Sequence, residues 1–254
     1  MNRPVSFRPR ALKFLTARPI AHRGLHDFDA GVVENTASAF AAAITGDYAI
    51  ECDLQITRDS EAVVFHDDTL ERLTEGKGPV KNSTAAEMKQ LKIRGTDDRV
   101  QTLGEFLQQV DGRVPLLIEL KSHWDDDERL VDRALNVLKD YDGPFALMSF
   151  DPDAVAAIAR KSPSTPRGIV ADRADRPFYD GFSLARRVEL RTLAHLPRTR
   201  PDFISFYYGE LPWAPLTAYR SAGFPIISWT IRSPEQAAMA QRYSDQITFE
   251  RFHA

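Results

Sequence analysis

The sequence of 254 residues contains one cysteine, Cys52, so no disulfide can form within the chain. A reducing compartment is consistent with this, and we expect a cytoplasmic location. No stretch approaches the ~20 consecutive apolar residues that cross a bilayer, and no apolar region of a signal peptide is visible. We therefore expect neither a disulfide scaffold nor stable insertion into a membrane.

Net charge is also small. The formal value is -3 at pH 7, which provides no reason to expect nucleic acid as a partner. The first 19 residues carry charge of one sign only, because they contain no acidic residue and five basic ones: Arg3, Arg8, Arg10, Lys13 and Arg18. Pro4 and Pro9 interrupt this segment, which favours a solvated arm or a segment that closes one end of the fold. A weak contact with an anionic membrane surface is the alternative. The sequence does not indicate an oligomeric state.

The chain does contain a regular alternation of apolar, β-branched runs with amphipathic or alanine-rich stretches. The apolar runs are continuously hydrophobic, which is typical of parallel strands covered on both faces. The strand-like runs are 19–23, 48–54, 114–121, 144–150, 167–171, 202–207, 225–231 and 246–249. The helical candidates between them are 35–45, 125–140, 153–161, 180–190, 213–222 and 234–243.

Eight β/α units in 254 residues predict an α/β fold, the (β/α)8 TIM barrel. An open doubly wound sheet is the alternative, because the strand count is uncertain. The connection 54–113 is far longer than a usual βα loop, and it contains another strand-like run, 62–66, and two short helical stretches, 84–91 and 103–110. No flexible linker bounds it. We therefore expect one domain, 1–254, with a small insertion at about 60–113 after the second strand.

Charged residues stand at the downstream ends of two of these runs. Glu51 and Asp53 lie in YAIECDLQ, and Glu119 and Lys121 lie in VPLLIELK. Because side chains in a strand alternate between two faces, the members of each pair share one face, which would otherwise be core. Buried charges are costly unless they are paired or bind a cation. In a TIM barrel the strand ends form the active site, so the pairs predict one there.

The three carboxylates offer only oxygen atoms to a metal. Such hard donors favour Ca²⁺, Mg²⁺ or Mn²⁺ over zinc. If Glu51 and Asp53 are considered alone, the alternative is that they lie at a solvated strand edge or form ion pairs with neighbouring arginines. With Glu119 on the next barrel strand, one divalent cation held by all three is the better interpretation.

Two histidines also follow strand-like runs: His22 in RPIAHRG and His66 in EAVVFHD. Each alone could simply be hydrogen-bonded to a loop, but beside three carboxylates they suit a general acid/base pair. Gly24 suggests that the strand has ended, so that Arg23 can turn toward the site. Arg23 and Lys121 then add two cations, which suit an anionic substrate and phosphate above all. This set of residues is typical of phosphoryl transfer.

The motifs that carry these residues resemble the glycerophosphodiester phosphodiesterases. The similar segments are AHRGLHDFDAGVVENTASAF, IECDLQITRD, VVFHDDTLERLTEGKGPV, TLGEFL, LLIELK, MSFDP and SWTI. They occur in the family's order and cover nearly the whole chain from Pro19 onward. The series HRG, E-x-D, HD and E-x-K is hard to meet by accident.

The resemblance implies a metal-dependent hydrolase with a small-molecule phosphodiester as substrate, and glycerol 3-phosphate and an alcohol as products. It also implies a TIM barrel with a small insertion after the second strand. The residues it assigns are the catalytic His22 and His66, the metal ligands Glu51, Asp53 and Glu119, and the phosphate contacts Arg23 and Lys121. Asn35, Phe150 and Trp229 are expected on the wall of the substrate site, although core packing explains the two aromatic residues equally well.

Two positions depart from the family. Val33 replaces a proline, which we expect to alter only a loop. Phe249 stands where the family has an aspartate, and Glu250 is next to it, so the role of Glu250 is open.

Two other functions remain as alternatives. A phospholipase D or lysophospholipase D reaction on lipids would need a wide apolar groove beside the site. A non-catalytic barrel that only binds a phosphate ligand would normally have lost a metal ligand or a histidine, and the expected set is complete.

Overall fold

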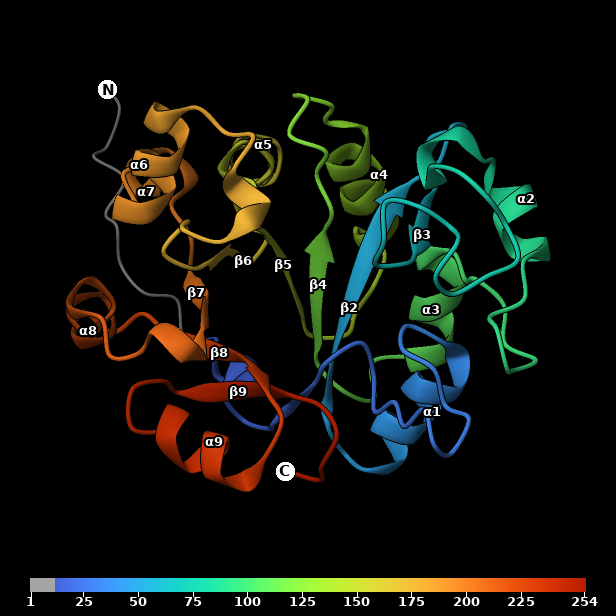
Figure 1. Cartoon of the computed structure of the whole chain (residues 1–254), viewed down its shortest axis with the longest axis horizontal. Helices are drawn as coiled ribbons and strands as arrows, with labels where there is room; N and C mark the ends of the chain where they lie inside the picture. Colours follow the sequence, from blue (N-terminus) through green and yellow to red (C-terminus); the bar gives the residue numbers. More distant parts are fainter. Residues whose placement is uncertain (1–11) are drawn as a thin grey trace.

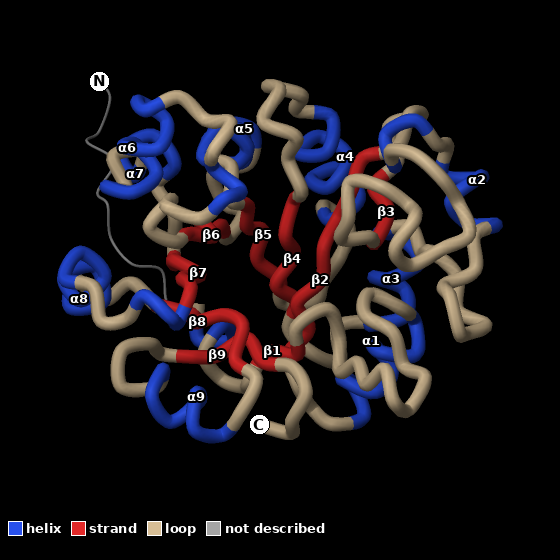
Figure 2. The backbone as a smooth tube through the Cα atoms, viewed as in Figure 1, coloured by secondary structure: helices blue, strands red, loops and turns tan. Residues whose placement is uncertain are grey.

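The apolar runs form a closed ring of strands with the helices outside, as Figures 1 and 2 show. The computed structural model describes residues 12–254. Within them, eight parallel strands pair in the order β1-β9-β8-β7-β6-β5-β4-β2, and the pairing of β1 with β2 closes the ring. The barrel strands are β1 (Ile20–Ala21), β2 (Ala49–Ile56), β4 (Leu116–Leu120), β5 (Phe145–Ser149), β6 (Arg167–Ala171), β7 (Phe203–Tyr207), β8 (Ile226–Ile231) and β9 (Gln246–Phe249). The prediction of a TIM barrel is confirmed.

The helices lie close to their expected ranges. Those outside the barrel are α1 (Ala37–Thr45), α4 (Arg129–Leu138), α5 (Pro152–Lys161), α6 (Leu184–Thr192), α7 (Leu196–Thr199), α8 (Ala214–Ser221) and α9 (Pro234–Ala240). The expected helix 180–190 begins later, because Ser183 caps α6 by accepting a hydrogen bond from the Arg186 backbone N–H. The four-residue α7 was not predicted. None of the helices within 12–254 is both long and apolar enough to cross a bilayer.

The long connection after β2 has structure of its own. Strand β3 (Ala62–Val64) pairs antiparallel with β2, and it is followed by α2 (Ala85–Gln90) and α3 (Leu103–Val110). Both helices begin with a capping box, in which a threonine and a glutamate satisfy each other's backbone N–H groups. We still interpret 1–254 as one domain that carries this insertion.

The two faces of the barrel strands have different surroundings. Ile50, Cys52 and Leu54 on β2 pack into the layer between strands and helices. Ala49 belongs to a separate apolar cluster, in which Leu117, Phe203 and other residues at the beginnings of the strands meet. Glu51 and Asp53 alternate with the outward-facing residues, so they continue the inner face toward the carboxyl ends of the strands.

The amino-terminal segment contributes to that inner cluster. Leu15, in a 3-10 helix at Lys13–Leu15, is 3% exposed and packs with Ile20 and Ala49. This part of the chain therefore closes the end of the barrel where the strands begin, as one of the two interpretations expected. The alternative, a weak membrane contact, was based on five basic residues, of which Arg3, Arg8 and Arg10 lie outside the described residues.

Candidate active site

The three expected metal ligands come together inside the barrel. Asp53 on β2 and Glu119 on β4 are register partners, and Glu51 lies one pleat earlier on the same face. Glu51 and Asp53 are 1% exposed and Glu119 is 6% exposed. One oxygen of each lies within 4.8 Å of the others. The arrangement is a compact, buried set of hard oxygen donors.

Two basic side chains offset part of this charge. Lys121 Nζ lies 2.7 Å from Glu119 Oε1 and 2.9 Å from Asp53 Oδ1, and Arg23 Nε lies 3.3 Å from Asp53 Oδ2. Burial opposes ionisation of Asp53, but Lys121, His66 and Arg23 together hold its pKa well below the usual range. Burial, with repulsion from Asp53 and Glu119, raises the pKa of Glu51 well above its usual value. A bound divalent cation would offset this repulsion and favour the ionised form of Glu51.

The turn after β1 positions Arg23 against these carboxylates. Arg23 has a φ of 56°, and its backbone N–H donates to Glu51 Oε2 at 2.9 Å. Its guanidinium donates to Glu34 Oε1 at 2.6 Å. Asn35 donates through Nδ2 to Asp53 Oδ2 at 2.8 Å. Arg23 therefore leaves the strand at a turn, as Gly24 indicated, and Asn35 supports a carboxylate.

His22 has a carboxylate partner that the family pattern did not assign. Its Nδ1 lies 2.6 Å from Glu250 Oε2, and Arg232 Nε donates to Glu250 Oε1 at 2.7 Å. Burial opposes ionisation of Glu250, but His22, His26 and Arg232 hold its pKa well below the usual range. An ionised carboxylate can only accept, so His22 carries its proton on Nδ1 and leaves Nε2 free. Burial also lowers the pKa of His22 to about 4.

The position of Glu250 follows from strand alternation. Phe249 ends β9 and packs outward against Tyr48, with ring centroids 4.9 Å apart. The next residue therefore returns to the inner face, where His22 is located. Glu250 thus reaches the site although Phe249 occupies the position of the family's aspartate.

His66 has a similar pair of partners. Its Nδ1 lies 2.7 Å from Asp67 Oδ1, and Arg72 Nη2 donates to the same oxygen at 2.8 Å. Burial opposes ionisation of Asp67, but these two neighbours lower the pKa of Asp67. Each histidine of the expected acid/base pair thus contacts a carboxylate, and this carboxylate in turn accepts a hydrogen bond from an arginine.

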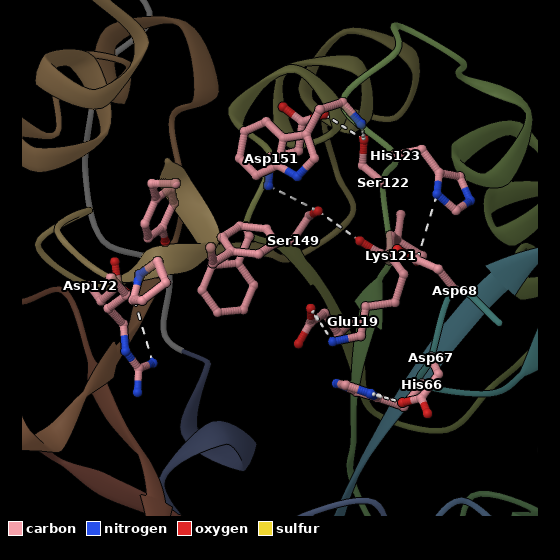
Figure 3. Close-up of a pocket in the computed structure, with 17 residues that line it drawn as sticks. His66, Asp67, Asp68, Glu119, Lys121, Ser122, His123, Ser149, Asp151 and Asp172 are labelled. Carbon is pink, nitrogen blue, oxygen red and sulfur yellow. Dashed lines mark hydrogen bonds and ion pairs between the residues drawn. The ribbon is translucent and has the colours of Figure 1, made fainter. Parts of the chain in front are cut away.

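Two cavities meet at these groups. The larger, of about 680 Å³, we call the aromatic cavity; it is shown in Figure 3. The smaller, of about 340 Å³, we call the polar cavity. Residues that line both are His66, Glu119, Lys121, Phe150 and Arg176. A substrate with two halves could therefore place its centre at the shared residues and one half in each cavity.

The cavities have different linings. The polar cavity contains hydroxyl groups and guanidinium groups: Ser205, Thr230, Thr248, Arg23 and Arg232, together with His22, Glu51, Tyr207 and Trp229. The aromatic cavity contains rings and carboxylates: Trp124, Phe178, Tyr179, Asp68, Asp151 and Asp172.

The structure brings the expected site residues together, and one of them, Asn35, lies elsewhere than expected. Phe150 lines both cavities, and Trp229 lines the polar cavity, where it donates Nε1–H to the Ser205 carbonyl at 3.0 Å. Asn35 lines neither and instead lies behind Asp53. Sequence reasoning did not identify Arg72 and Arg232, or Trp124, Phe178 and Tyr179 of the aromatic cavity. Asp67 could have been identified from the sequence, because it directly follows His66.

Comparisons with known proteins identify the family of this chain. The model of the glycerophosphoryl diester phosphodiesterase family matches residues 22–246. A glycerophosphodiester phosphodiesterase of Caldanaerobacter subterraneus is 26% identical over 226 residues, which cover 85% of this chain and 86% of that protein.

Solved structures are similar as well. The glycerophosphodiester phosphodiesterase of Thermotoga maritima has a TM-score of 0.69 at 26% identity and covers 91% of this chain and 92% of its own. A phosphodiesterase of Oleispira antarctica, solved with the product sn-glycerol-3-phosphate, has a TM-score of 0.79 at 21% identity and covers 95% of this chain and 96% of its own.

The chain belongs to the glycerophosphoryl diester phosphodiesterase family, a family of phosphoric diester hydrolases. The predictions of this family and of an enzyme of this class are confirmed.

Proposed function

We propose that the protein hydrolyses glycerophosphodiesters to glycerol 3-phosphate and an alcohol, with one divalent cation held by Glu51, Asp53 and Glu119. The observation that carries this proposal is the convergence of three buried carboxylates, two cations and two carboxylate-bound histidines around the polar cavity. His66, Glu119 and Lys121 of this set also line the aromatic cavity. The Oleispira protein's product, sn-glycerol 3-phosphate, is the product we propose here.

The donor set supports a hard cation. Its oxygen atoms suit Ca²⁺, Mg²⁺ or Mn²⁺, and a bound cation would offset the repulsion that raises the pKa of Glu51. When bound, such a cation supplies charge stabilisation to phosphate oxygens. Asn35 keeps Asp53 in place through its 2.8 Å hydrogen bond, and the Arg23 backbone does the same for Glu51.

Arg23 and Lys121 are proposed to bind the phosphate. The guanidinium of Arg23 and the ammonium of Lys121 line the polar cavity beside the carboxylates, and burial does not neutralise them, because neighbouring carboxylates keep their pKa values above the usual range. Both therefore remain charged and can offset the negative charge that develops on the phosphate oxygens.

His22 and His66 are proposed to exchange the protons of the nucleophile and the leaving group. Glu250 and Asp67 hold the Nδ1–H of each ring, so that each Nε2 is available for proton transfer. We infer that Glu250 is a positioning residue for His22. The family's aspartate corresponds to the preceding position, which is Phe249 in this chain.

The test is an assay of chelated protein on a panel of glycerophosphodiesters, with Ca²⁺, Mg²⁺ or Mn²⁺ added separately. We expect release of glycerol 3-phosphate only after metal is added, and its loss again with EDTA. Failure to release glycerol 3-phosphate from any member of the panel with any of the metals would contradict the proposal.

A lysophospholipase D reaction on lipid phosphodiesters is the second candidate. The aromatic lining of the larger cavity is the observation that favours it. It predicts activity only on micellar or vesicle-bound substrate, whereas our first proposal predicts activity on dissolved glycerophosphodiesters. The cytoplasmic location stays a prediction.

A further inference from the structure

We propose that His22, His26 and Glu250 form a second metal site, which prefers Zn²⁺ and related transition metals, and that a metal bound there inhibits the enzyme. The site is separate from the three carboxylates assigned to the hard cation. The inhibition rests on the proposed function, because it acts through His22, whereas the binding of metal does not.

The ends of two neighbouring strands bring the ligands together. Ala21 of β1 and Phe249 of β9 are register partners, and Figure 2 shows the two strands side by side. The residues that follow them, His22 and Glu250, therefore meet, and His22 Nδ1 lies 2.6 Å from Glu250 Oε2. The turn after β1 then returns the chain, so that His26 Nε2 lies 3.6 Å from the same oxygen.

These distances suit a single ion. One possible ligand atom from each of the three residues lies within 4.8 Å of the others. In a tetrahedral zinc site with bonds of about 2.0–2.1 Å, neighbouring ligand atoms are about 3.3 Å apart. Small movements of the side chains are therefore enough for all three ligands to surround one ion.

His26 lacks the partner that a buried nitrogen needs. Its side chain is 6% exposed, and Nε2 has no hydrogen-bond partner among residues 12–254. Glu250 Oε2, at 3.6 Å, is beyond hydrogen-bond distance. A buried polar atom without a partner is costly, and each such atom in a folded protein calls for an explanation. A metal ion between the ring and the carboxylate satisfies both groups.

The kinds of ligand atom separate this site from the other one. Two imidazole nitrogens and one carboxylate oxygen are a set that binds zinc in proteins and leaves a fourth position open. Imidazole suits zinc, copper and nickel, whereas sites of oxygen alone suit Mg²⁺ and Ca²⁺. We therefore expect Zn²⁺ to prefer the histidine site and the hard cation to prefer the carboxylates.

The two oxygens of Glu250 have different neighbours. Oε1 accepts a hydrogen bond from Arg232 Nε at 2.7 Å and lies 3.6 Å from Arg251 Nε, whereas Oε2 lies beside the two histidines. The hydrogen bond from Arg232 orients the carboxylate, as partners of metal ligands commonly do. The two guanidinium groups also repel a cation. We therefore expect zinc to bind less tightly than in structural sites, with a Kd on the order of micromolar.

Metal binding moves the proton of His22 to the wrong nitrogen. Without metal, Glu250 holds Nδ1–H and leaves Nε2 free to accept a proton. A neutral imidazole that binds a metal through Nδ1 carries its proton on Nε2 instead. A residue that exchanges protons with the substrate must have a free Nε2 at one stage of turnover, and the metal-bound ring does not.

A third cavity gives the metal a route that the substrate does not use. His26 lines a cavity of about 610 Å³, together with Asp27, Asp29, His253 and others, whereas His22 lines the polar cavity. The two carboxylates attract cations to the third cavity. Zinc can therefore reach His26 while substrate occupies the polar cavity. We expect inhibition that lowers kcat and that excess substrate does not relieve.

The first test measures binding without activity. Protein saturated with Mg²⁺ is titrated with Zn²⁺ in calorimetry and with Co²⁺ in visible spectroscopy. We expect one site with a Kd on the order of micromolar and the absorption of four-coordinate Co²⁺. Both should be lost in His26→Gln and kept in His253→Gln. His253→Gln is the matched control, because His253 lines the same cavity but is not one of the three ligands.

Nitrogen NMR of the wild type gives a result that does not depend on the folding of a variant. Zn²⁺ should shift the ring signals of two of the six histidines, one bound through Nδ1 and the other through Nε2. Absence of zinc binding to the wild type, or zinc binding that shifts no histidine signal, would overturn the proposal.

The second test measures inhibition, with each protein compared with its own activity without zinc. In the Mg²⁺-loaded wild type and in His253→Gln, saturating Zn²⁺ should lower kcat at least about ten-fold. In His26→Gln the loss should be less than about two-fold. Equal inhibition of all three proteins, or inhibition that excess Mg²⁺ relieves, would place the zinc elsewhere and contradict the proposal.

The two tests distinguish failure of this proposal from failure of the proposed function. If no glycerophosphodiester is hydrolysed but Co²⁺ binds to the wild type and not to His26→Gln, the proposed function fails and the metal site stands. If the diesters are hydrolysed and zinc neither binds nor inhibits, the function stands and the metal site fails. Zinc that binds at His26 without lowering kcat would overturn the inhibitory role.

Discussion

The two cavities that meet at Lys121 are built from different parts of the barrel. The hydroxyl groups of the polar cavity belong to strands themselves, with Ser205 on β7, Thr230 on β8 and Thr248 on β9. The rings of the aromatic cavity belong to loops, with Trp124 after β4 and Phe178 after β6. Strand positions are fixed by the hydrogen-bonded ring, whereas loops can differ in length and sequence without disturbing it. Changes in the loops can therefore alter the aromatic cavity while the strands keep the polar cavity unchanged.

The largest effect should come from the centre that both cavities share. Glu51→Gln removes one carboxylate of the metal set, so kcat/KM should fall about a thousand-fold or more for every ester, whichever alcohol it carries. Steady-state assays with glycerophosphodiesters of different alcohols check this. Glu75→Gln, at a carboxylate with 86% of its side chain exposed, is the control.

Folding and activity can be separated in the same variant. The amide removes the repulsion of Glu51 by Asp53 and Glu119, so the metal-free variant should unfold at no lower temperature than the metal-free wild type. A loss of activity for one ester only, or a large drop in melting temperature, would contradict the assignment of Glu51 to a shared metal site.

The next largest effect should come from the two histidines, which differ in the cavities that they line. We infer that His66 is the proton donor to the leaving alcohol, because it lines both cavities and His22 lines only the polar one of the two. His66→Ala should reduce kcat/KM for an ester of an aliphatic alcohol by about a hundred-fold or more, because the alkoxide then leaves without a proton. With a p-nitrophenyl ester, whose leaving group needs no proton, the loss should be much smaller. His22→Ala should reduce both esters alike. The reverse pattern would exchange the two roles.

A smaller effect is expected at the carboxylate behind His22. Glu250→Gln keeps the size of the side chain but removes the charge that holds Nδ1–H, so kcat should fall about ten- to a hundred-fold with little change in KM. A merely structural role would leave the pH profile of kcat unchanged, whereas a positioning role should shift it. The loss should not depend on the alcohol, since His22 acts from the polar cavity.

The sequence predicted the strand-borne part of this site far better than the loop-borne part. Glu51, Asp53, Glu119 and Lys121 could be placed because period-two alternation and the convergence of strand ends are general rules. The same alternation, continued from Thr248, would have placed Glu250 on the inner face.

The aromatic cavity could not be predicted in this way. Trp124 and Phe178 lie in segments whose path depends on left-handed residues and local packing, with a φ of 59° at Trp124 itself. No periodicity indicates which way such a residue points. Asn35 shows the same limit, because its motif was visible but its contact with Asp53 depends on the turn that Arg23 makes.

The smallest effect should concern stability alone, at a buried histidine that lines neither cavity. His195, between α6 and α7, is 1% exposed, and burial lowers its pKa to about 4. Between that value and the unfolded value of 6.5 the unfolded chain binds more protons, so stability is lost as pH falls through this window. His195→Gln should remove up to about 3 kcal/mol of that loss. Urea unfolding of both proteins at several pH values checks this. Because His22 titrates in both, both should lose stability as pH falls. An equal dependence of the unfolding free energy on pH would show that His195 does not contribute.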